Sequence, residues 1–272
     1  MALPFNPLDY PYHLKLPKWM SPINDWQGHI PFSFLFSEIV KPQKIVELGV
    51  YAGDSFFSFV QAKTDFNIPG QCIGIDHWRG DPDMGIEDRS TVYERVCDVR
   101  DKYFPQDKDN PTPILMRMSF DDALQHVPDG SVDLLHIDGW HAYEAVSKDF
   151  ETWLPKLSST GTVFFHDTEI CYPYSKGAEA LDHPIDGSHR FFKEMRLKYP
   201  GQWFQFRHFH GLGILSPGIG THSFLSSLYE NALTADGEKI RKYFDLLGSR
   251  LYALYLWRKN FLNDGEELDA LQ

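Results

Sequence analysis

Acidic and histidine side chains follow several apolar segments of this sequence, at the points where those segments end. Glu47 and Asp76 end the first two of these segments. Asp138 follows a later one, with His141 three residues beyond it, and Asp167 follows the next. Carboxylates can hold hydroxyl groups, cationic ligands or metal ions, and an imidazole can accept a proton near neutral pH. These residue types therefore predict a polar site with acid–base chemistry.

The side chains can meet only if the apolar segments before them lie side by side as strands. Segments of strand length alternate with segments of helical periodicity along most of the chain. The predicted strands cover residues 44–49, 71–76, 113–118, 132–138, 161–166, 203–209 and 211–216, and the predicted helices cover 55–63, 88–103, 119–127, 141–157 and 188–198. This order predicts an α/β fold with a doubly wound, mostly parallel, seven-stranded sheet that ends in an antiparallel hairpin. Ligands of such sheets bind beyond the carboxyl ends of the strands.

The turn after the first strand predicts the kind of cofactor. Gly49 and Gly53 mark a tight turn into a helix, as in loops that hold phosphates. Glu47 lies inside this motif, however, and Tyr51 occupies a position at which a pyrophosphate needs a close backbone approach. A cofactor without phosphates therefore fits better than NAD. S-adenosylmethionine (SAM) is such a molecule, because a carboxylate such as Asp76 can hold its ribose diol.

The composition favours a small molecule or a neutral glycan over nucleic acid. The 272 residues carry a formal net charge of −12, which repels polyanions. The three cysteines, Cys72, Cys97 and Cys171, are scattered and predict neither a disulfide framework nor a zinc site. No segment has the ~20 apolar residues of a membrane span or the pattern of a secretion signal. We therefore expect a cytoplasmic protein with no transmembrane segment and no nucleic-acid partner.

The two ends of the chain differ from its middle. Residues 1–24 contain five prolines and predict an extended arm over the surface, after which Asn24 or Asp25 can cap a helix. In the extension 217–272, apolar residues at helical spacing predict an amphipathic helix over 237–262. A basic amphipathic helix can contact an anionic membrane, its own domain or a dimer partner, and we favour a homodimer.

Six segments of the sequence resemble a known family. They cover residues 28–32, 47–53, 76–81, 133–146, 164–168 and 211–215. In order and spacing they resemble class I SAM-dependent methyltransferases, specifically the branch with sugar O-methyltransferases and glycosyltransferase-associated methyltransferase domains (methyltransferase domain family 24 type). The resemblance implies a Rossmann-like methyltransferase domain over 25–216, between the arm and the helical extension.

The resemblance also implies which residues hold the cofactor. The loop that binds SAM would contain Glu47, Gly49, Tyr51 and Gly53, with Asp76 at the ribose and Trp78, Ser119 and Phe120 near the adenine. The alternative is structural, because a serine at a strand end can simply cap the following helix.

Two devices could activate an acceptor hydroxyl. Metal-dependent sugar methyltransferases, which this chain resembles, bind their ion through one acid after the fourth strand and two acids after the fifth. Asp138 and Asp167 match two of these positions, and His166 stands at the third. This set would bind a divalent ion, magnesium or manganese, although the nitrogen ligand weakens the case for magnesium. The other device is His141 acting as a general base beside Asp138, without a metal.

Three further histidines and two loops complete the candidates. We expect His29 to be structural, and we do not expect His208 and His210, which flank a turn, to form a metal pair. Residues 79–90 can fold across the cofactor, and residues 168–188 are long enough to shape the acceptor pocket. Both loops are therefore predicted lids.

These features predict a SAM-dependent O-methyltransferase that acts on a hydroxyl of a sugar or glycan. One alternative is a methyltransferase for a phenolic or other natural-product acceptor, because the fold constrains SAM far more than the acceptor. A second alternative is a noncatalytic module of the same fold that accompanies glycan assembly.

Overall fold

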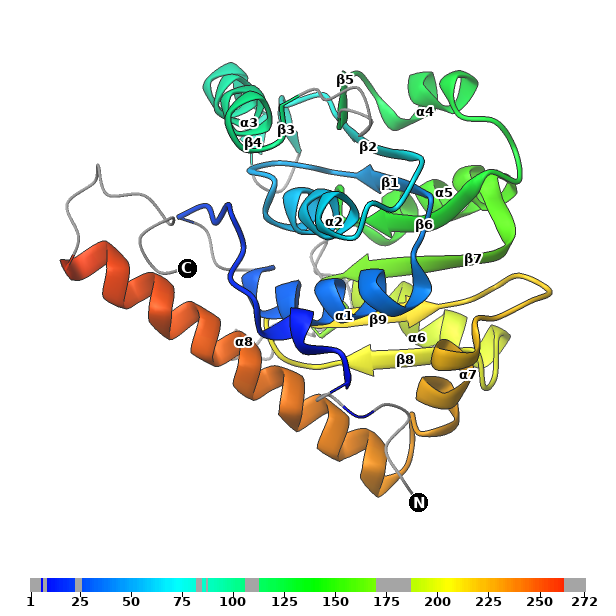
Figure 1. The fold of residues 1–272 in the computed structure, drawn as a ribbon. Coiled ribbons are helices and arrows are strands. Elements are labelled where there is room, and N and C mark those ends of the chain that lie inside the picture. The colour runs from blue at the N-terminus through cyan, green and yellow to red at the C-terminus, as the bar shows by residue number, and fades with distance from the viewer. Residues whose placement is uncertain are drawn as a thin grey trace, which may run out of the picture.

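The computed structural model describes residues 6, 9–22, 26–81, 85–86, 88–105, 113–169 and 187–261. Within these residues, the main sheet has seven strands in the order β5-β2-β1-β6-β7-β9-β8 (Figure 1). Neighbouring strands are parallel except that β9 runs antiparallel to β7 and to β8. The carboxyl ends of β1, β2, β6 and β7 therefore meet at one edge of the sheet.

The elements have the following bounds. The strands are β1 (Lys44–Leu48), β2 (Gln71–Asp76), β3 (Gly80–Asp81), β4 (Gly85–Ile86), β5 (Ile114–Arg117), β6 (Val132–Ile137), β7 (Leu157–His166), β8 (Trp203–Phe206) and β9 (Leu212–Leu215). The α-helices are α1 (Ile30–Val40), α2 (Asp54–Asp65), α3 (Ser90–Tyr103), α4 (Phe120–Ala123), α5 (Tyr143–Trp153), α6 (Gly187–Lys198), α7 (Ser223–Glu230) and α8 (Ala235–Phe261). Short 3₁₀ helices are η2 (Pro11–Leu14), η3 (Gln27–His29), η4 (Leu124–His126) and η5 (Leu154–Lys156).

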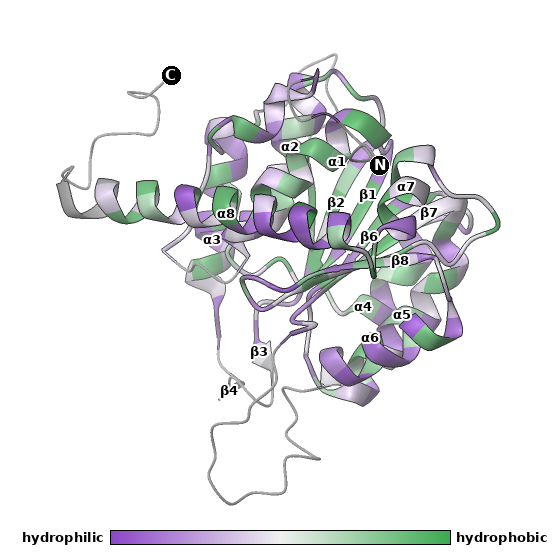
Figure 2. Ribbon diagram, turned by 90° about the horizontal axis from the view of Figure 1, so that it is seen from below, coloured by the Kyte–Doolittle hydropathy of each residue, from purple (hydrophilic) through white to green (hydrophobic). Residues whose placement is uncertain are grey.

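Helices cover both faces of the sheet. Figure 2 shows α1 and α2 on one side and α4, α5 and α6 on the other. The central strands β1 and β6 are therefore buried along most of their length, which explains their continuous apolar sequences. Glu47 and His136 are the polar residues among the buried positions of these strands, and they lie opposite each other in the register.

The first half of α8 packs on its own domain. Phe244 has its ring centroid 5.4 Å from that of Phe32 in α1 and 5.4 Å from that of Phe206 in β8. Ile240 and Leu251 are also buried. The predicted C-terminal helix is confirmed, and this face of it is covered by the chain itself. Within the described residues, no helix is both long enough and apolar enough to cross a membrane.

The predicted sheet is confirmed, including its antiparallel ending, with three local differences. β7 begins at Leu157 rather than at residue 161, and its register with β6 shifts between the pairs Val132–Leu157 and Leu134–Thr162. The α7 helix was not predicted, because eight residues carry little periodicity. The predicted lid over 79–90 contains the small hairpin of β3 and β4.

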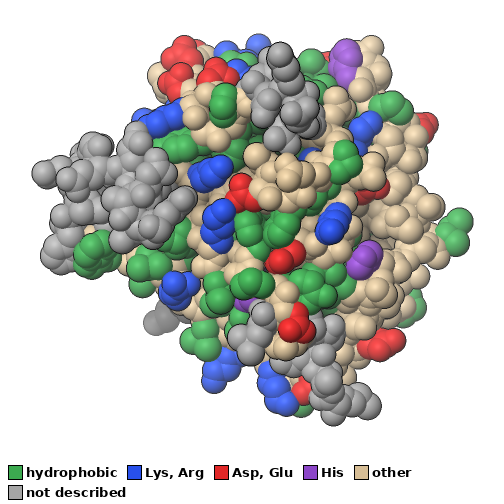
Figure 3. Space-filling view, in the orientation of Figure 1, with side chains coloured by type: hydrophobic (Ala, Val, Ile, Leu, Met, Phe, Trp, Pro, Cys, Tyr) green, Lys and Arg blue, Asp and Glu red, His purple; other side chains and the backbone are tan. Residues whose placement is uncertain are grey.

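The N-terminal arm is less extended and less superficial than predicted. Its described part contains η2, and the side chains of His13 and Ser21 are 1% and 0% exposed. The proposed cap residues Asn24 and Asp25 lie outside the described residues, as does most of the predicted lid over 168–188. On the face seen in Figure 3, lysine and arginine side chains are interspersed with acidic and apolar ones.

A candidate active site at the carboxyl edge of the sheet

The β1–α2 loop, residues 49–53, bends tightly and packs against the loop after β6. Gly49 has φ +91°, and a Cβ atom there would lie 2.0 Å from the carbonyl oxygen of Asp138. Gly53 has φ +87°, and a Cβ atom there would lie 2.7 Å from the ring of Phe57. A side chain at either position would combine a strained backbone with a clash. Gly49 thus allows the close approach of the two loops, and Gly53 allows the loop to pack on Phe57 of α2.

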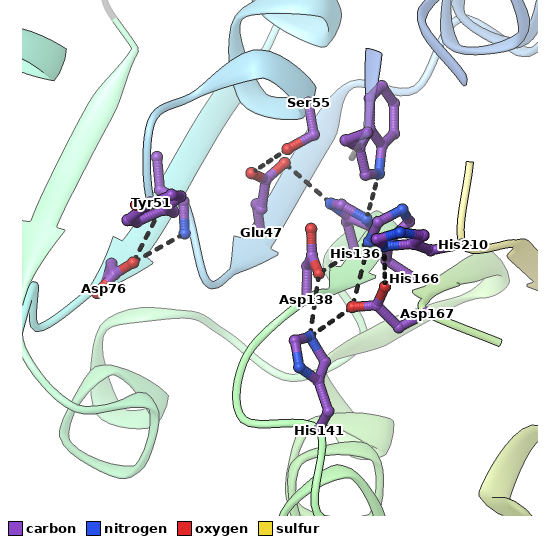
Figure 4. A network of polar contacts seen from close by, with 12 residues as sticks. Glu47, Tyr51, Ser55, Asp76, His136, Asp138, His141, His166, Asp167 and His210 are labelled. Carbon is purple, nitrogen blue, oxygen red and sulfur yellow. Dashed lines mark hydrogen bonds and ion pairs between the residues drawn. The ribbon is translucent and has the colours of Figure 1, made fainter. Parts of the chain in front are cut away.

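Asp76, at the end of β2, binds the backbone of this loop. Its Oδ2 accepts hydrogen bonds from the amides of Val50 (3.1 Å) and Tyr51 (3.0 Å), as Figure 4 shows in part. Its Oδ1 accepts one from the amide of Trp78 at 2.6 Å. The side chain is still 16% exposed, and Oδ1 has a second lone pair for a ligand hydroxyl. Asp76 therefore orders the loop and can also receive a ligand.

Tyr51 and Trp78 are linked to each other within this region. The Trp78 indole is 1% exposed and donates to the Tyr51 carbonyl at 2.9 Å. Its ring lies against Tyr93, with centroids 4.6 Å apart. The Tyr51 ring is 38% exposed, and the guanidinium of Arg89 lies 5.1 Å from its centroid. Trp78 thus supports the loop from inside the protein, while Tyr51 presents an aromatic surface.

The carboxylate of Glu47 is fully buried beneath the loop. Its Oε1 accepts from Ser55 at 2.7 Å, and its Oε2 lies 3.1 Å from Nδ1 of His136. The Trp26 indole donates to Nε2 of His136 at 3.1 Å, so Nδ1 carries the ring hydrogen that faces Glu47. Burial raises the pKa of Glu47, and His136 and Ser55 oppose the rise. Glu47 therefore holds β1, β6 and α2 together from the inside.

Ser119 and Phe120 lie after β5. The Ser119 hydroxyl accepts from the amide of Asp122 at 3.1 Å and donates to its carboxylate at 2.7 Å, which are the bonds of a helix N-cap. The Phe120 ring lies so close to Gly139 that a Cβ atom there would be 2.6 Å from it. Phe120 thus borders the loop after β6, whereas the hydroxyl of Ser119 begins α4.

Asp138 and Asp167 converge at the ends of β6 and β7, with two imidazoles between them (Figure 4). His141 Nε2 lies 2.6 Å from Asp167 Oδ2 and 3.7 Å from Asp138 Oδ1. His166 Nδ1 lies 3.3 Å from Asp138 Oδ1 and 3.4 Å from Asp167 Oδ2. The fold therefore brings together all four residues that the sequence singled out for proton or metal chemistry.

His210 is a fifth member that sequence analysis did not assign to the site. Its Nδ1 lies 3.3 Å from Asp167 Oδ1. The preceding carbonyl, of Phe209, accepts a hydrogen bond from Nε2 of His166 at 3.2 Å. Phe209, His210 and Gly211 all have positive φ (+45°, +66° and +88°). This left-handed turn between β8 and β9 thus supports the acidic pair from a third side, and its one sequence signal is the glycine.

His29 and His208, the other two histidines considered in the sequence, have structural partners. His29 is fully buried and donates from Nε2 to the Phe209 carbonyl at 3.1 Å, as a structural histidine should. Burial, followed by the nearby His208 and His166, lowers its pKa well below the usual value. His208 Nε2 lies 3.3 Å from the carbonyl of Gly28. His208 and His210 therefore point to different partners.

The acidic pair and the two imidazoles between them stabilise one another's charges. Burial alone would lower the pKa of His141, but Asp138 and Asp167 raise it to about 10. The same carboxylates hold the pKa of His166 well above its usual value, again against burial. The pKa values of both carboxyl groups are lowered in spite of burial, chiefly by His166. Our expectation of a near-neutral pKa for His141 is therefore wrong for this state, because it left out the two carboxylates.

Three residues of this cluster could hold a metal ion. The ligand atoms of Asp138, His141 and Asp167 all lie within 4.8 Å of one another. This set contains His141 where the sequence-based set contains His166. Mixed nitrogen and oxygen donors suit manganese, iron or zinc better than magnesium.

Residues 46–168 match a family described as "Methyltransferase domain". The match runs from within β1 to just beyond β7, and it includes the β1–α2 loop, Asp76 and the acidic pair. This segment of the chain is therefore similar to a methyltransferase domain. Both of the regions described above lie within the matched segment, whereas His210 lies beyond it.

A protein of Sinorhizobium fredii, the uncharacterized protein y4gI, is similar to most of this chain. The two are 34% identical over 238 residues, which are 86% of this chain and 24% of that protein. The chain thus spans about a quarter of the length of the curated relative that it matches.

Solved structures share the fold of this chain. The SAH-bound methyltransferase PaMTH1 of Podospora anserina aligns with a TM-score of 0.50 at 17% identity, covering 73% of this chain and 80% of that chain. A proposed caffeoyl-CoA O-methyltransferase of Staphylococcus aureus aligns with a TM-score of 0.53 at 16% identity, covering 78% and 90%. At these identities the similarity concerns the fold alone.

Proposed function

We propose that this protein is a methyltransferase that transfers the methyl group of SAM to a hydroxyl of a sugar or glycan. The proposal rests on one observation, the position of the acidic pair directly beside the β1–α2 loop. The amide of Asp138 donates to the carbonyl of Leu48 at 2.8 Å, and Gly49 packs on the Asp138 carbonyl. An acceptor held by Asp138 and Asp167 would therefore lie next to a cofactor held by the loop, as direct displacement requires.

The residues of the loop fit SAM. Gly49 and Gly53 allow a close approach of backbone and ligand, and Asp76 is partly exposed with a second lone pair on Oδ1. We assign cofactor binding to these residues together with Tyr51, and to Trp78 and Phe120 at the borders. When bound, SAM supplies an electrophilic methyl group on a sulfonium.

The acceptor proton is the harder part of the reaction. In the metal-free site, His141 is protonated at neutral pH and the carboxylates are held ionised, so each is a weak base. Two imidazolium groups balance the negative charges of the two carboxylates. One divalent cation could supply the same positive charge instead. Asp138, His141 and Asp167 would hold this ion, with His166 beside them, and it would acidify and orient a diol. We therefore favour a metal over His141 as an unaided base.

Calorimetry with SAM and methyl transfer from labelled SAM test the proposal. The acceptor panel contains nucleotide sugars, oligosaccharides and phenols. We expect the protein to bind SAM and to transfer the methyl group to a sugar hydroxyl. A chelator should abolish the transfer and manganese should restore it, while the affinity for SAM changes little. Methyl transfer to phenols alone would show that the acceptor is a phenol and not a sugar or glycan. SAM binding without transfer to any acceptor would favour the noncatalytic module.

The phenolic alternative has one observation in its favour. Tyr51 and Trp140 are 38% and 37% exposed, and they belong to the loops that follow β1 and β6. Exposed aromatic rings at the edge of a site can stack on an aromatic acceptor, although they stack equally well on the apolar face of a sugar. Competition between a phenol and an oligosaccharide for one site would separate the two.

The outer face of α8 supports our expectation of a homodimer. Leu246, Leu256 and Trp257 are 61%, 38% and 47% exposed, although α8 buries its other face on its own domain. Leu246→Glu should convert a dimer to a monomer in sedimentation analysis. Leu197→Glu is the control, since Leu197 is 80% exposed on α6. A wild-type monomer, or a dimer that survives Leu246→Glu, would contradict this interface.

A further inference from the structure

Two tryptophans bind neighbouring carbonyl groups of the β1–α2 loop from different parts of the chain. The indole of Trp78, after β2, donates to the carbonyl of Tyr51 at 2.9 Å. The indole of Trp19, in the N-terminal arm, donates to the carbonyl of Ala52 at 3.0 Å. The amide of Gly53 then closes the turn on the Val50 carbonyl at 2.8 Å. The arm thus contributes a direct bond to the tightest part of the loop.

A second contact from the arm holds the residue that follows the loop. Asp54 is the first residue of α2 and is 8% exposed. Its Oδ1 accepts from the amide of Ser21 at 2.8 Å, and its Oδ2 accepts from the Ser21 hydroxyl at 2.5 Å. Gln27 donates to the Ser21 carbonyl at 2.7 Å, which fixes Ser21 in turn. Both ends of the turn from Ala52 to Asp54 are therefore tied to the arm.

The arm is itself held between α2 and α8. The hydroxyl of Tyr12 donates to Asp65 of α2 at 2.7 Å, and the amide of Lys18 donates to the side chain of Gln61 at 2.7 Å. On the other side, His13 Nε2 lies 2.5 Å from the hydroxyl of Tyr243 in α8. These contacts keep Trp19 and Ser21 in place, and none of them touches the loop.

We propose that Trp19 and Ser21 are positioning residues of the cofactor site, so that the N-terminal arm sets the affinity of the loop for SAM. The inference rests on the proposed binding of SAM by this loop. Tyr51 and Gly53 have positive φ, a conformation that the backbone does not favour by itself at Tyr51. Fixing the Ala52 carbonyl and Asp54 removes alternative conformations before the cofactor arrives, and such preorganisation increases affinity. The arm lies outside the residues that match the family.

The test compares two conservative changes in the same arm. Trp19→Phe removes the indole donor to the loop and keeps an aromatic ring. Tyr12→Phe removes the bond to Asp65 and leaves the loop contacts intact. By calorimetry with the full chain, Trp19→Phe should weaken SAM about threefold to tenfold, the effect of one lost hydrogen bond. Tyr12→Phe should leave SAM affinity unchanged, even if it lowers the melting temperature as much as Trp19→Phe does.

Hydrogen exchange gives a second measurement that needs no cofactor. Trp19→Phe and Ser21→Ala should speed amide exchange in residues 50–54, and Tyr12→Phe should not. The positioning role is refuted if Trp19→Phe and Ser21→Ala exchange as the unmodified chain does. It is also refuted if Tyr12→Phe speeds exchange in the loop equally. An unmodified chain that binds no SAM would refute the proposed function, while the exchange data would still decide whether the arm orders the loop.

Discussion

The two halves of the site are held by different kinds of interaction. The β1–α2 loop is shaped by backbone geometry, since its glycines have positive φ and its amides bind Asp76. The acidic pair is held by charged side chains, with His141, His166 and His210 within 3.4 Å of Asp167. The first half depends on backbone conformation and on one carboxylate, whereas in the second half each charge depends on the others.

This difference implies different responses to substitution. A change in the loop should act through conformation, and therefore on stability and cofactor affinity together. A change in the acidic pair should act through charge, and therefore on turnover. Three variants test this separation, and a fourth tests an acid beside the site.

The largest effect is expected at the acidic pair. Asp138→Asn removes a charge from the cluster and a potential metal ligand, so turnover should fall by about 10²- to 10⁴-fold. SAM affinity should be almost unchanged. Asp133→Asn is a matched control at the other end of β6, where Asp133 binds the amides of Gln43 and Lys44. Methyl transfer and calorimetry measure both. An Asp138→Asn enzyme with full turnover would remove Asp138 from the mechanism.

The next effect tests the contact between the two halves. Gly49→Ala places a methyl group against the carbonyl of Asp138 and keeps a left-handed backbone, so unfolding free energy should fall by roughly 2–4 kcal/mol. Gly130→Ala provides the comparison, because Gly130 has φ +67° with no atom within 4 Å of an added Cβ. That change should cost only about 1 kcal/mol. Urea titration of both measures the difference. Equal losses would show that backbone strain alone, and not the loop contact, requires glycine at position 49.

Asp76→Ala tests the loop alone. It removes the acceptor of three backbone hydrogen bonds as well as a ligand contact, so SAM affinity should fall about tenfold to a hundredfold. Turnover at saturating SAM should change much less. Calorimetry and saturation kinetics separate the two quantities, and unchanged SAM affinity in the folded variant would rule out Asp76 as a cofactor residue.

The smallest effect is expected at an acid near the site whose ionised form is destabilised by burial. Asp149 in α5 is 8% exposed, and burial raises its pKa to about 7 although Lys148 opposes the rise. The folded state thus keeps a proton that the unfolded chain releases near pH 4, so this group lowers stability as pH rises from about 4 to 7. Asp149→Asn should remove that slope and gain about 1–2 kcal/mol at pH 8. Thermal melts across this range would show parallel pH profiles if the prediction is wrong.

The sequence predicted the loop better than it predicted the acidic cluster. Gly49, Gly53 and Asp76 shape one loop near the ends of two adjacent strands. The spacing of the glycines and the order of the strands along the chain can both be read from the sequence. The burial of Glu47 was not visible, because its partner His136 depends on the register between two strands. Periodicity identifies strands and leaves their register open.

The acidic cluster was predicted only in part, for a related reason. Asp138, His141, His166 and Asp167 follow predicted strands, so their convergence could be expected. His210 comes from a turn whose left-handed residues include Phe209, a type that gives little turn signal. The pKa of His141 was also mispredicted, because it depends on two carboxylates whose distances only the fold defines.

The place of β9 in the sheet has a consequence for biosynthesis. β9 lies between β7 and β8 although it follows both in the sequence, and the turn before it carries His210 to Asp167. A ribosome therefore delivers β1, β2 and β6 before the residues that complete the acidic cluster exist. We expect methyl transfer to be absent until His210 has emerged, and the full affinity for the cofactor to be reached only after α8, which holds the arm, has followed.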